Sequence, residues 1–124
     1  MTAFNLALIL SSTFLSALGQ IALKVGTSTP HIKAAMADAD LIERYRLMLS
    51  SPLVIGGLLS YVLGTLVWLR VISALDISQA YPFVALGFLV TLAFGLIVLG
   101  EPMHPTRLIG AALILGGVVL VGLR

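Results

Sequence analysis

Long apolar stretches alternate with short polar clusters along the chain. Three of these stretches contain no Asp, Glu, Lys or Arg, and a shorter charge-free stretch follows Arg107. A helix needs roughly 20 mainly apolar residues to cross a hydrocarbon core about 30 Å thick. The pattern therefore predicts an all-α membrane protein with a single transmembrane domain, residues 1–124. Its four spans are expected at about residues 3–23, 52–70, 78–99 and 105–123.

The first and last spans have distinctive ends. The first charge-free stretch is longer than the roughly 7–15-residue apolar region of a signal peptide, and no basic cluster precedes it. We therefore expect it to be a retained transmembrane helix. Pro105 suits the first turn of the fourth helix, where a missing N–H costs nothing. Arg124 is placed to anchor the other end of that helix at the membrane interface.

The connection between the first two spans, residues 24–51, carries most of the charge. Asp40 and Arg44 have the i,i+4 spacing of a helical ion pair. Such a helix either lies in the membrane interface or packs as a solvated helix on its own bundle, and the pattern leaves both alternatives open. The apolar positions that recur at three- and four-residue steps, as in an amphipathic helix, are Ile32, Ala35, Ala39, Ile42, Tyr45 and Leu49.

The composition excludes several other classes of protein. The chain is 60% hydrophobic and 10% charged, whereas soluble domains are about 45–50% apolar and about 25% charged. The net charge of +2 is too small to indicate nucleic-acid binding. There are no cysteines, and the two histidines lack a metal-ligand spacing. No nucleophile, base and acid form a catalytic set, so we expect neither an enzyme nor a metal or other cofactor.

Positive charges are distributed unequally between the two sides of the predicted bundle. The side with more Lys and Arg in its short loops usually faces the cytoplasm. We therefore predict that both termini face the periplasm of a bacterial inner membrane. Of the seven Lys and Arg residues, the five on the cytoplasmic side are Lys24, Lys33, Arg44, Arg46 and Arg107, and the two on the other side are Arg70 and Arg124.

One face of the first span is polar. Ser12, Ser16 and Gln20 follow one another at four-residue steps. Asn5 lies on the same face, and Lys24 continues it at the membrane boundary. Polar groups inside a span are candidates for a functional site, so this face is a candidate wall of a polar groove. The alternative is that the serines bond to carbonyls of their own helix and only Gln20 needs a partner.

The second and third spans add two tyrosines and several small residues. Tyr61 lies near the middle of the second span, where its hydroxyl needs a partner, and Trp68 suits an interfacial belt. Pro82 is expected to hold Tyr81 in an extended conformation at a helix start, with a routine first-turn proline as the alternative. Gly57 and Gly64 share one stripe of the second span with Tyr61 and Trp68. Small residues that favour close helix packing recur at Gly87, Thr91 and Gly95 in the third span and at Ala112, Gly116 and Gly117 in the fourth.

Charged residues are absent from the middle of every predicted span. Glu101 and His104 fall only at a membrane boundary. Proton-coupled exchange usually depends on a titratable group inside the membrane, so this pattern does not favour a proton-coupled exporter.

Several motifs resemble the drug/metabolite transporter superfamily. Ser-Ala-Leu-Gly-Gln-Ile-Ala-Leu-Lys at residues 16–24 is similar to its first-helix motif. Gln-Ala-Tyr-Pro at residues 79–82 and Gly-Glu-Pro at residues 100–102 are similar to the four-helix EamA-like subunits of the aminoarabinose-phosphoundecaprenol flippase. The resemblance covers all four spans. The small multidrug resistance family is a more distant resemblance, and Ser16 occupies the position of its essential membrane glutamate.

The flippase resemblance implies a substrate that is an undecaprenyl-phosphate-linked sugar or a related polyprenyl phosphate. It also implies pairing, either with an identical subunit or with a paralogous four-helix subunit. The alternatives are a small multidrug-type exporter and a non-transporting subunit of a glycosyltransferase or transporter complex. We expect the head group between the first and third helices, near Lys24 and the start of the third helix. The candidate substrate-binding residues are Ser12, Ser16, Gln20, Lys24, Tyr61, Tyr81, Arg70 and Arg107.

Overall fold

The computed structural model describes residues 1–123, and every regular element in that range is a helix. The anchor predicted at Arg124 lies outside the described residues. The elements are α1 (Ala3–Thr27), α2 (Pro30–Ala37), α3 (Leu41–Ser50), α4 (Pro52–Ala74), α5 (Ile77–Ala80), the 3₁₀ helix η1 (Tyr81–Val84), α6 (Ala85–Ile97) and α7 (Pro105–Gly122).

Within the described residues, four helical segments are long and apolar enough to cross a membrane, which confirms the predicted all-α membrane fold. They are α1, α4, the run from Ile77 to Ile97 and α7. The helix ends differ from those expected, because α1 continues to Thr27 and α4 to Ala74. Lys24 therefore lies in the last turn of α1 instead of the loop after it. In the most apolar window of α7 only 6% of residues are buried, so the rest of that surface needs hydrocarbon or protein around it.

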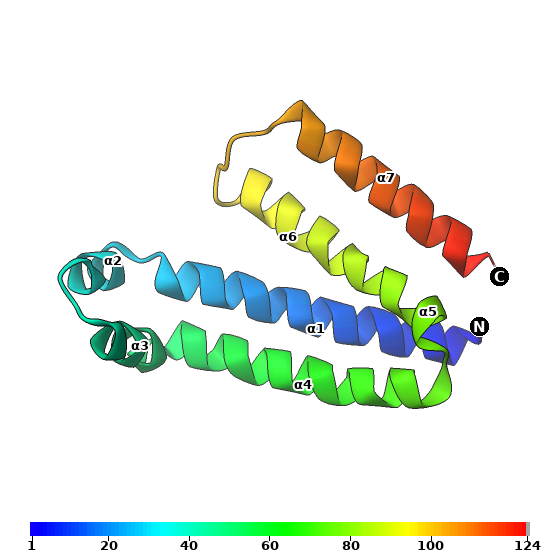
Figure 1. Cartoon of the computed structure of the whole chain (residues 1–124), viewed down its shortest axis with the longest axis horizontal. Helices are drawn as coiled ribbons and strands as arrows, with labels where there is room; N and C mark the ends of the chain where they lie inside the picture. The colour runs from blue at the N-terminus through cyan, green and yellow to red at the C-terminus, as the bar shows by residue number, and fades with distance from the viewer. Residues whose placement is uncertain (124) are drawn as a thin grey trace.

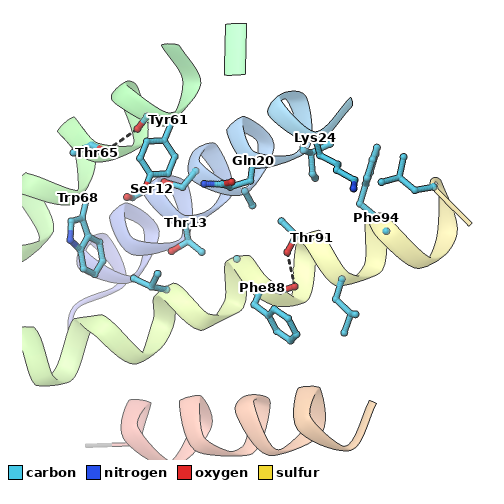
Figure 2. Close-up of a pocket in the computed structure, with 18 of the residues that line it drawn as sticks. Ser12, Thr13, Gln20, Lys24, Tyr61, Thr65, Trp68, Phe88, Thr91 and Phe94 are labelled. Carbon is cyan, nitrogen blue, oxygen red and sulfur yellow. Dashed lines mark hydrogen bonds between the residues drawn. The ribbon is translucent and has the colours of Figure 1, made fainter. Parts of the chain in front are cut away.

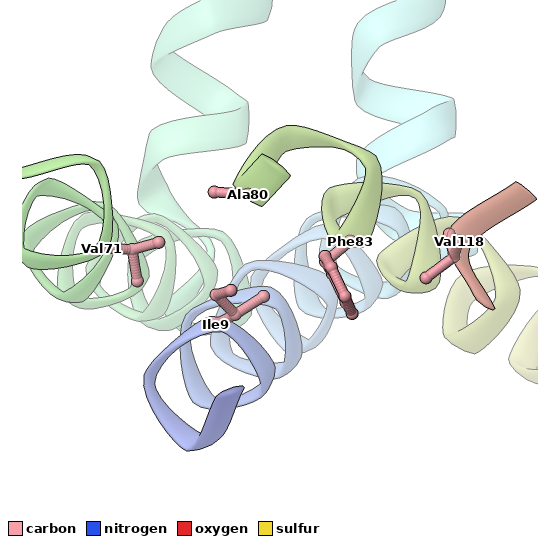
Figure 3. Close-up of a cluster of buried hydrophobic side chains, with 5 residues drawn as sticks. All are labelled: Ile9, Val71, Ala80, Phe83 and Val118. Carbon is pink, nitrogen blue, oxygen red and sulfur yellow. The ribbon is translucent and has the colours of Figure 1, made fainter. Parts of the chain in front are cut away.

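The helices form a bundle in which α1 and α4 lie side by side and antiparallel (Figure 1). α6 runs in the same direction as α1, and α7 returns along the outer side of α6. The end of α7 therefore lies toward the same end of the bundle as the N-terminus, while α2, α3 and the connection from α6 to α7 lie toward the opposite end. Close to the terminal end, α5 and η1 pack on α1 and α4 around the apolar cluster of Ile9, Val71, Ala80, Phe83 and Val118 (Figure 3).

The seam between α1 and α4 depends on glycine. A Cβ atom at Gly57 would lie 2.8 Å from the carbonyl oxygen of Gly19, and a Cβ at Gly19 would lie 2.8 Å from that of Gly57. The stripe of α4 that contains Gly57 and Gly64 therefore faces α1. Two hydroxyls also cross this seam, because Ser12 Oγ donates to the Gly64 carbonyl at 2.8 Å and Ser60 Oγ to the Leu15 carbonyl at 2.8 Å. Such bonds hold membrane helices together where water is excluded.

The third span is one continuous helical path with a 3₁₀ segment at its proline. The Tyr81 N–H donates to the Ile77 carbonyl, and Tyr81 has φ −62° and ψ −37°. The expectation of an extended Tyr81 beside free helix N–H groups is therefore wrong. The helix begins earlier, at Ile77, so the Tyr81 N–H is already bonded within it. Pro82 lies inside the third span, where the 3₁₀ helix η1 accommodates its missing N–H.

The connection between α1 and α4 contains two short helices instead of the single amphipathic helix expected. The break falls before Asp40, whose side chain caps α3 by accepting from the Glu43 N–H at 2.8 Å. The predicted ion pair from Asp40 to Arg44 does not form, because Arg44 Nε donates to the Ala39 carbonyl at 3.0 Å. The exposed ion pair in this segment joins Arg46 to Glu43 at 3.6 Å.

The sidedness of the bundle remains a prediction that labelling can test. Both termini are expected in the periplasm, and the chain contains no native cysteine to confuse the result. We expect Arg124→Cys to react with a membrane-impermeant maleimide in intact cells. Asp38→Cys, on the other side, should react only after permeabilisation. Cytoplasmic labelling of Arg124→Cys would contradict the prediction, and labelling of each position from both sides would show dual insertion.

Candidate substrate cavity

A cavity of about 800 Å³ lies between α1, α4 and α6 (Figure 2), and residues of the connection to α7 also line it. Seven of the eight residues predicted to bind substrate line this cavity. The exception is Arg70, which is exposed near the end of α4 and does not line it. The seven that the structure brings together are Ser12, Ser16, Gln20, Lys24, Tyr61, Tyr81 and Arg107.

The α1 wall is polar, but its residues are not equivalent. Ser12 is 2% exposed and its hydroxyl is used in the bond to α4, so it contributes to the seam. Ser12 therefore does not bond to a carbonyl of its own helix, which was the predicted alternative. Gln20 is exposed to the cavity space. Thr13, which the sequence pattern did not single out, is 6% exposed, and its Oγ1 is buried without a hydrogen-bond partner.

The α4 wall supplies aromatic surface. Tyr61 lines the cavity from the middle of α4, and Thr65, one turn further on, donates to the Tyr61 carbonyl at 2.9 Å. Trp68 packs against the apolar cluster and lines the same cavity. Its ring meets that of Tyr81 edge to face, with centroids 6.3 Å apart and an interplanar angle of 66°. This aromatic pair forms one end of the cavity.

Ionisable groups form the opposite end. Lys24 extends from the last turn of α1 toward Phe94 near the end of α6 (Figure 2). Arg107 lines the cavity from the first turn of α7, and Glu101 lines it from the preceding connection. Within residues 1–123 none of these three side chains forms an ion pair. The sequence alone placed Glu101 at a membrane boundary, whereas the structure makes it part of the cavity wall.

Lys24 and Tyr81 are too far apart to contact one phosphate. Gly87 of α6 packs against Thr13 and Ala17 of α1, and the two helices run in the same direction (Figure 1). Tyr81 precedes Gly87, and Lys24 follows Ala17. At about 1.5 Å per helical residue, their backbones are separated by roughly 20 Å along the bundle. The single head-group site predicted near both residues is therefore replaced by an elongated cavity with an aromatic end and a charged end.

These features define a polytopic membrane protein whose helices line an elongated, partly open cavity, mostly apolar, into which several polar and ionisable side chains face. Residues 2–123 match the model of the EamA-like transporter family. The chain belongs to that family.

Named relatives in this family include transport subunits. The chain is 34% identical over 116 residues to a protein of Pseudomonas aeruginosa strain UCBPP-PA14, covering 94% of this chain and 95% of the relative. That relative is named a probable 4-amino-4-deoxy-L-arabinose-phosphoundecaprenol flippase subunit ArnE. A subunit named ArnF from Sodalis glossinidius is 36% identical over 71 residues, covering 56% of this chain and 55% of the relative.

The similarity also extends to a protein without an assigned role. The uncharacterized protein y4nH of Sinorhizobium fredii is 30% identical over 122 residues, covering 98% of this chain and 97% of the relative. No solved structure matches the chain. Family membership makes the protein a membrane transporter component, and the ArnE and ArnF relatives are named as probable flippase subunits.

Proposed function

We propose that the protein is a subunit of a bacterial inner-membrane flippase that moves a sugar linked to undecaprenyl phosphate or a related polyprenyl phosphate. The observation that carries this proposal is the cavity, which joins two cations at one end to neutral polar and aromatic groups along its length. An anionic phosphate matches Lys24 and Arg107. Sugar hydroxyls match hydroxyl and amide groups such as those of Ser16, Gln20 and Tyr61.

The size of the cavity also supports a head group as its occupant. Cavities of roughly 300–1,000 Å³ suit compact organic ligands, and this one is about 800 Å³. The apolar tail of such a lipid is far longer than a head group, so it stays in the bilayer while the head group crosses.

The flippase is proposed to contain a second four-helix subunit, either identical or paralogous. Open space surrounds Gly116 and Gly117, because a Cβ atom at either position would meet nothing within 4 Å. Small residues without a neighbour in the chain allow another helix to approach closely. The assignment of distinct ArnE and ArnF names to the relatives favours a paralogous partner.

A head-group comparison in vesicles tests this function. Purified protein, alone and with its co-purifying subunit, is reconstituted and offered a polyprenyl phosphate sugar and the corresponding polyprenol. We expect saturable binding and protein-dependent flipping of the phosphorylated lipid and much weaker binding of the polyprenol, which lacks the charge that Lys24 and Arg107 recognise. Equal binding of both lipids, or transport of small cationic solutes in place of lipid, would contradict the proposal.

A further inference from the structure

Glu101 is held against the cavity by its local backbone. Gly100 has a φ of +65°, a left-handed conformation that favours glycine. The turn returns the chain onto α6, where the Glu101 N–H donates to the Gly95 carbonyl at 2.9 Å. The carboxylate then lies over Gly95, and a Cβ atom at that position would be 2.8 Å from Glu101 Oε2. Glycine at position 95 therefore leaves room for this carboxylate.

The carboxylate charge of Glu101 has no cationic partner in the described part of the chain. Its carboxylate forms no ion pair within residues 1–123, although Lys24 and Arg107 line the same cavity. A partly buried carboxylate beside apolar helices is costly unless a cation or donor meets it. The cavity end thus presents two positive groups and one negative group, which is the charge complement of a zwitterion.

We propose that Glu101 binds a protonated amino group on the head group, while Lys24 and Arg107 bind its phosphate. This inference rests on the proposed flippase function and assigns recognition of an amine on the head group to one residue of this chain. Glu101 is then a specificity-determining residue, and Gly95 positions its carboxylate by leaving the space that it occupies.

The test compares two lipids that differ only at the amine. One is a polyprenyl phosphate carrying a 4-amino sugar, and the other is the same lipid with that amine N-acetylated. We expect the parent protein to bind the amino lipid about tenfold more tightly, as a charge-assisted hydrogen bond would give. Glu101→Gln should abolish this preference, measured as the ratio of the dissociation constants of the two lipids, because any effect on binding of the phosphate is common to both and cancels in the ratio.

Two glycine variants test whether the position of the Glu101 carboxylate determines the preference, with Glu101 itself retained. Gly95→Ala should displace the carboxylate and reduce the preference, although Glu101 remains. Gly56→Ala is the matched control, since a Cβ atom there meets nothing within 4 Å, and it should keep the parent preference. If Glu101→Gln fails to fold, Gly95→Ala and Glu101→Asp decide the matter, because unchanged preference in both would overturn the inference.

The parent protein alone distinguishes failure of this inference from failure of the proposed function. If it binds both lipids equally well, Glu101 does not select an amine, and the flippase proposal stands. If it binds neither lipid, the proposed function fails and the inference fails with it.

Discussion

Gly57→Ala is expected to lower the free energy of unfolding by about 1–3 kcal/mol relative to Gly56→Ala. The two substitutions are the same, lie on the same helix and gain the same helix propensity. They differ in what the new methyl group meets. At position 57 it lies 2.8 Å from the backbone oxygen of Gly19 and 3.1 Å from the Ala22 Cβ, whereas at position 56 it meets nothing within 4 Å. A backbone atom cannot move aside as a flexible side chain can.

Chemical denaturation of the purified variants in the same detergent would measure this difference. Gly19→Ala should be destabilising for the same reason, because its methyl group would lie 2.8 Å from the Gly57 carbonyl oxygen. The double variant should cost less than the sum of the two single variants, since α1 and α4 need to separate only once. Equal stability of Gly56→Ala and Gly57→Ala would show that the seam is looser than the structure indicates.

The membrane fold was predictable because lipid imposes a simple length requirement. A span must be about 20 apolar residues long, and the charge-free stretches met that requirement. The ends of α1 were less predictable, because a lysine can extend its stem along a helix and reach the interface. Lys24 therefore marks the boundary of the apolar stretch but not the end of α1, which continues to Thr27.

The polar wall of the cavity was predictable where a single helix determines it. Ser16 and Gln20 share a face because they are four residues apart. The orientation of Glu101 depends instead on the turn at Gly100 and on the space at Gly95. Residue spacing within one span cannot predict either feature. The partner of Ser12 likewise depended on how closely α4 approaches α1.

The separation of Lys24 from Tyr81 also follows from the direction in which the spans run. The first and third spans of any membrane bundle run in the same direction. Lys24 ends the first span and Tyr81 begins the third, so the two residues lie toward opposite membrane surfaces. The prediction that both residues line one cavity agrees with the structure. Lining one cavity does not place Lys24 and Tyr81 at the same depth in the membrane.

Lys24→Ala is expected to weaken binding of the phosphorylated lipid by about 1.5–3 kcal/mol, a factor of roughly 10–150. The reason is that Lys24 supplies a full positive charge to the charged end of the cavity. Lys33→Ala is the matched control, because it removes the same charge from the exposed helix α2, outside the cavity. Equilibrium binding of a polyprenyl phosphate sugar to folded variants, at one fixed salt concentration, would compare the two.

Tyr81→Phe extends the comparison to the aromatic end. Because Tyr81 lies roughly 20 Å from Lys24 along the bundle, a single phosphate cannot join them, and their effects on binding should add within about 0.5 kcal/mol. Strong coupling between the two variants would mean that the cavity closes around the head group in a different conformation. If Lys24→Ala and Tyr81→Phe both bind like the parent, the head group lies elsewhere. The basic segment from Lys33 to Arg46 is then the next surface to vary, since its cations lie on the same side of the membrane as Lys24 and reach the same lipid phosphates.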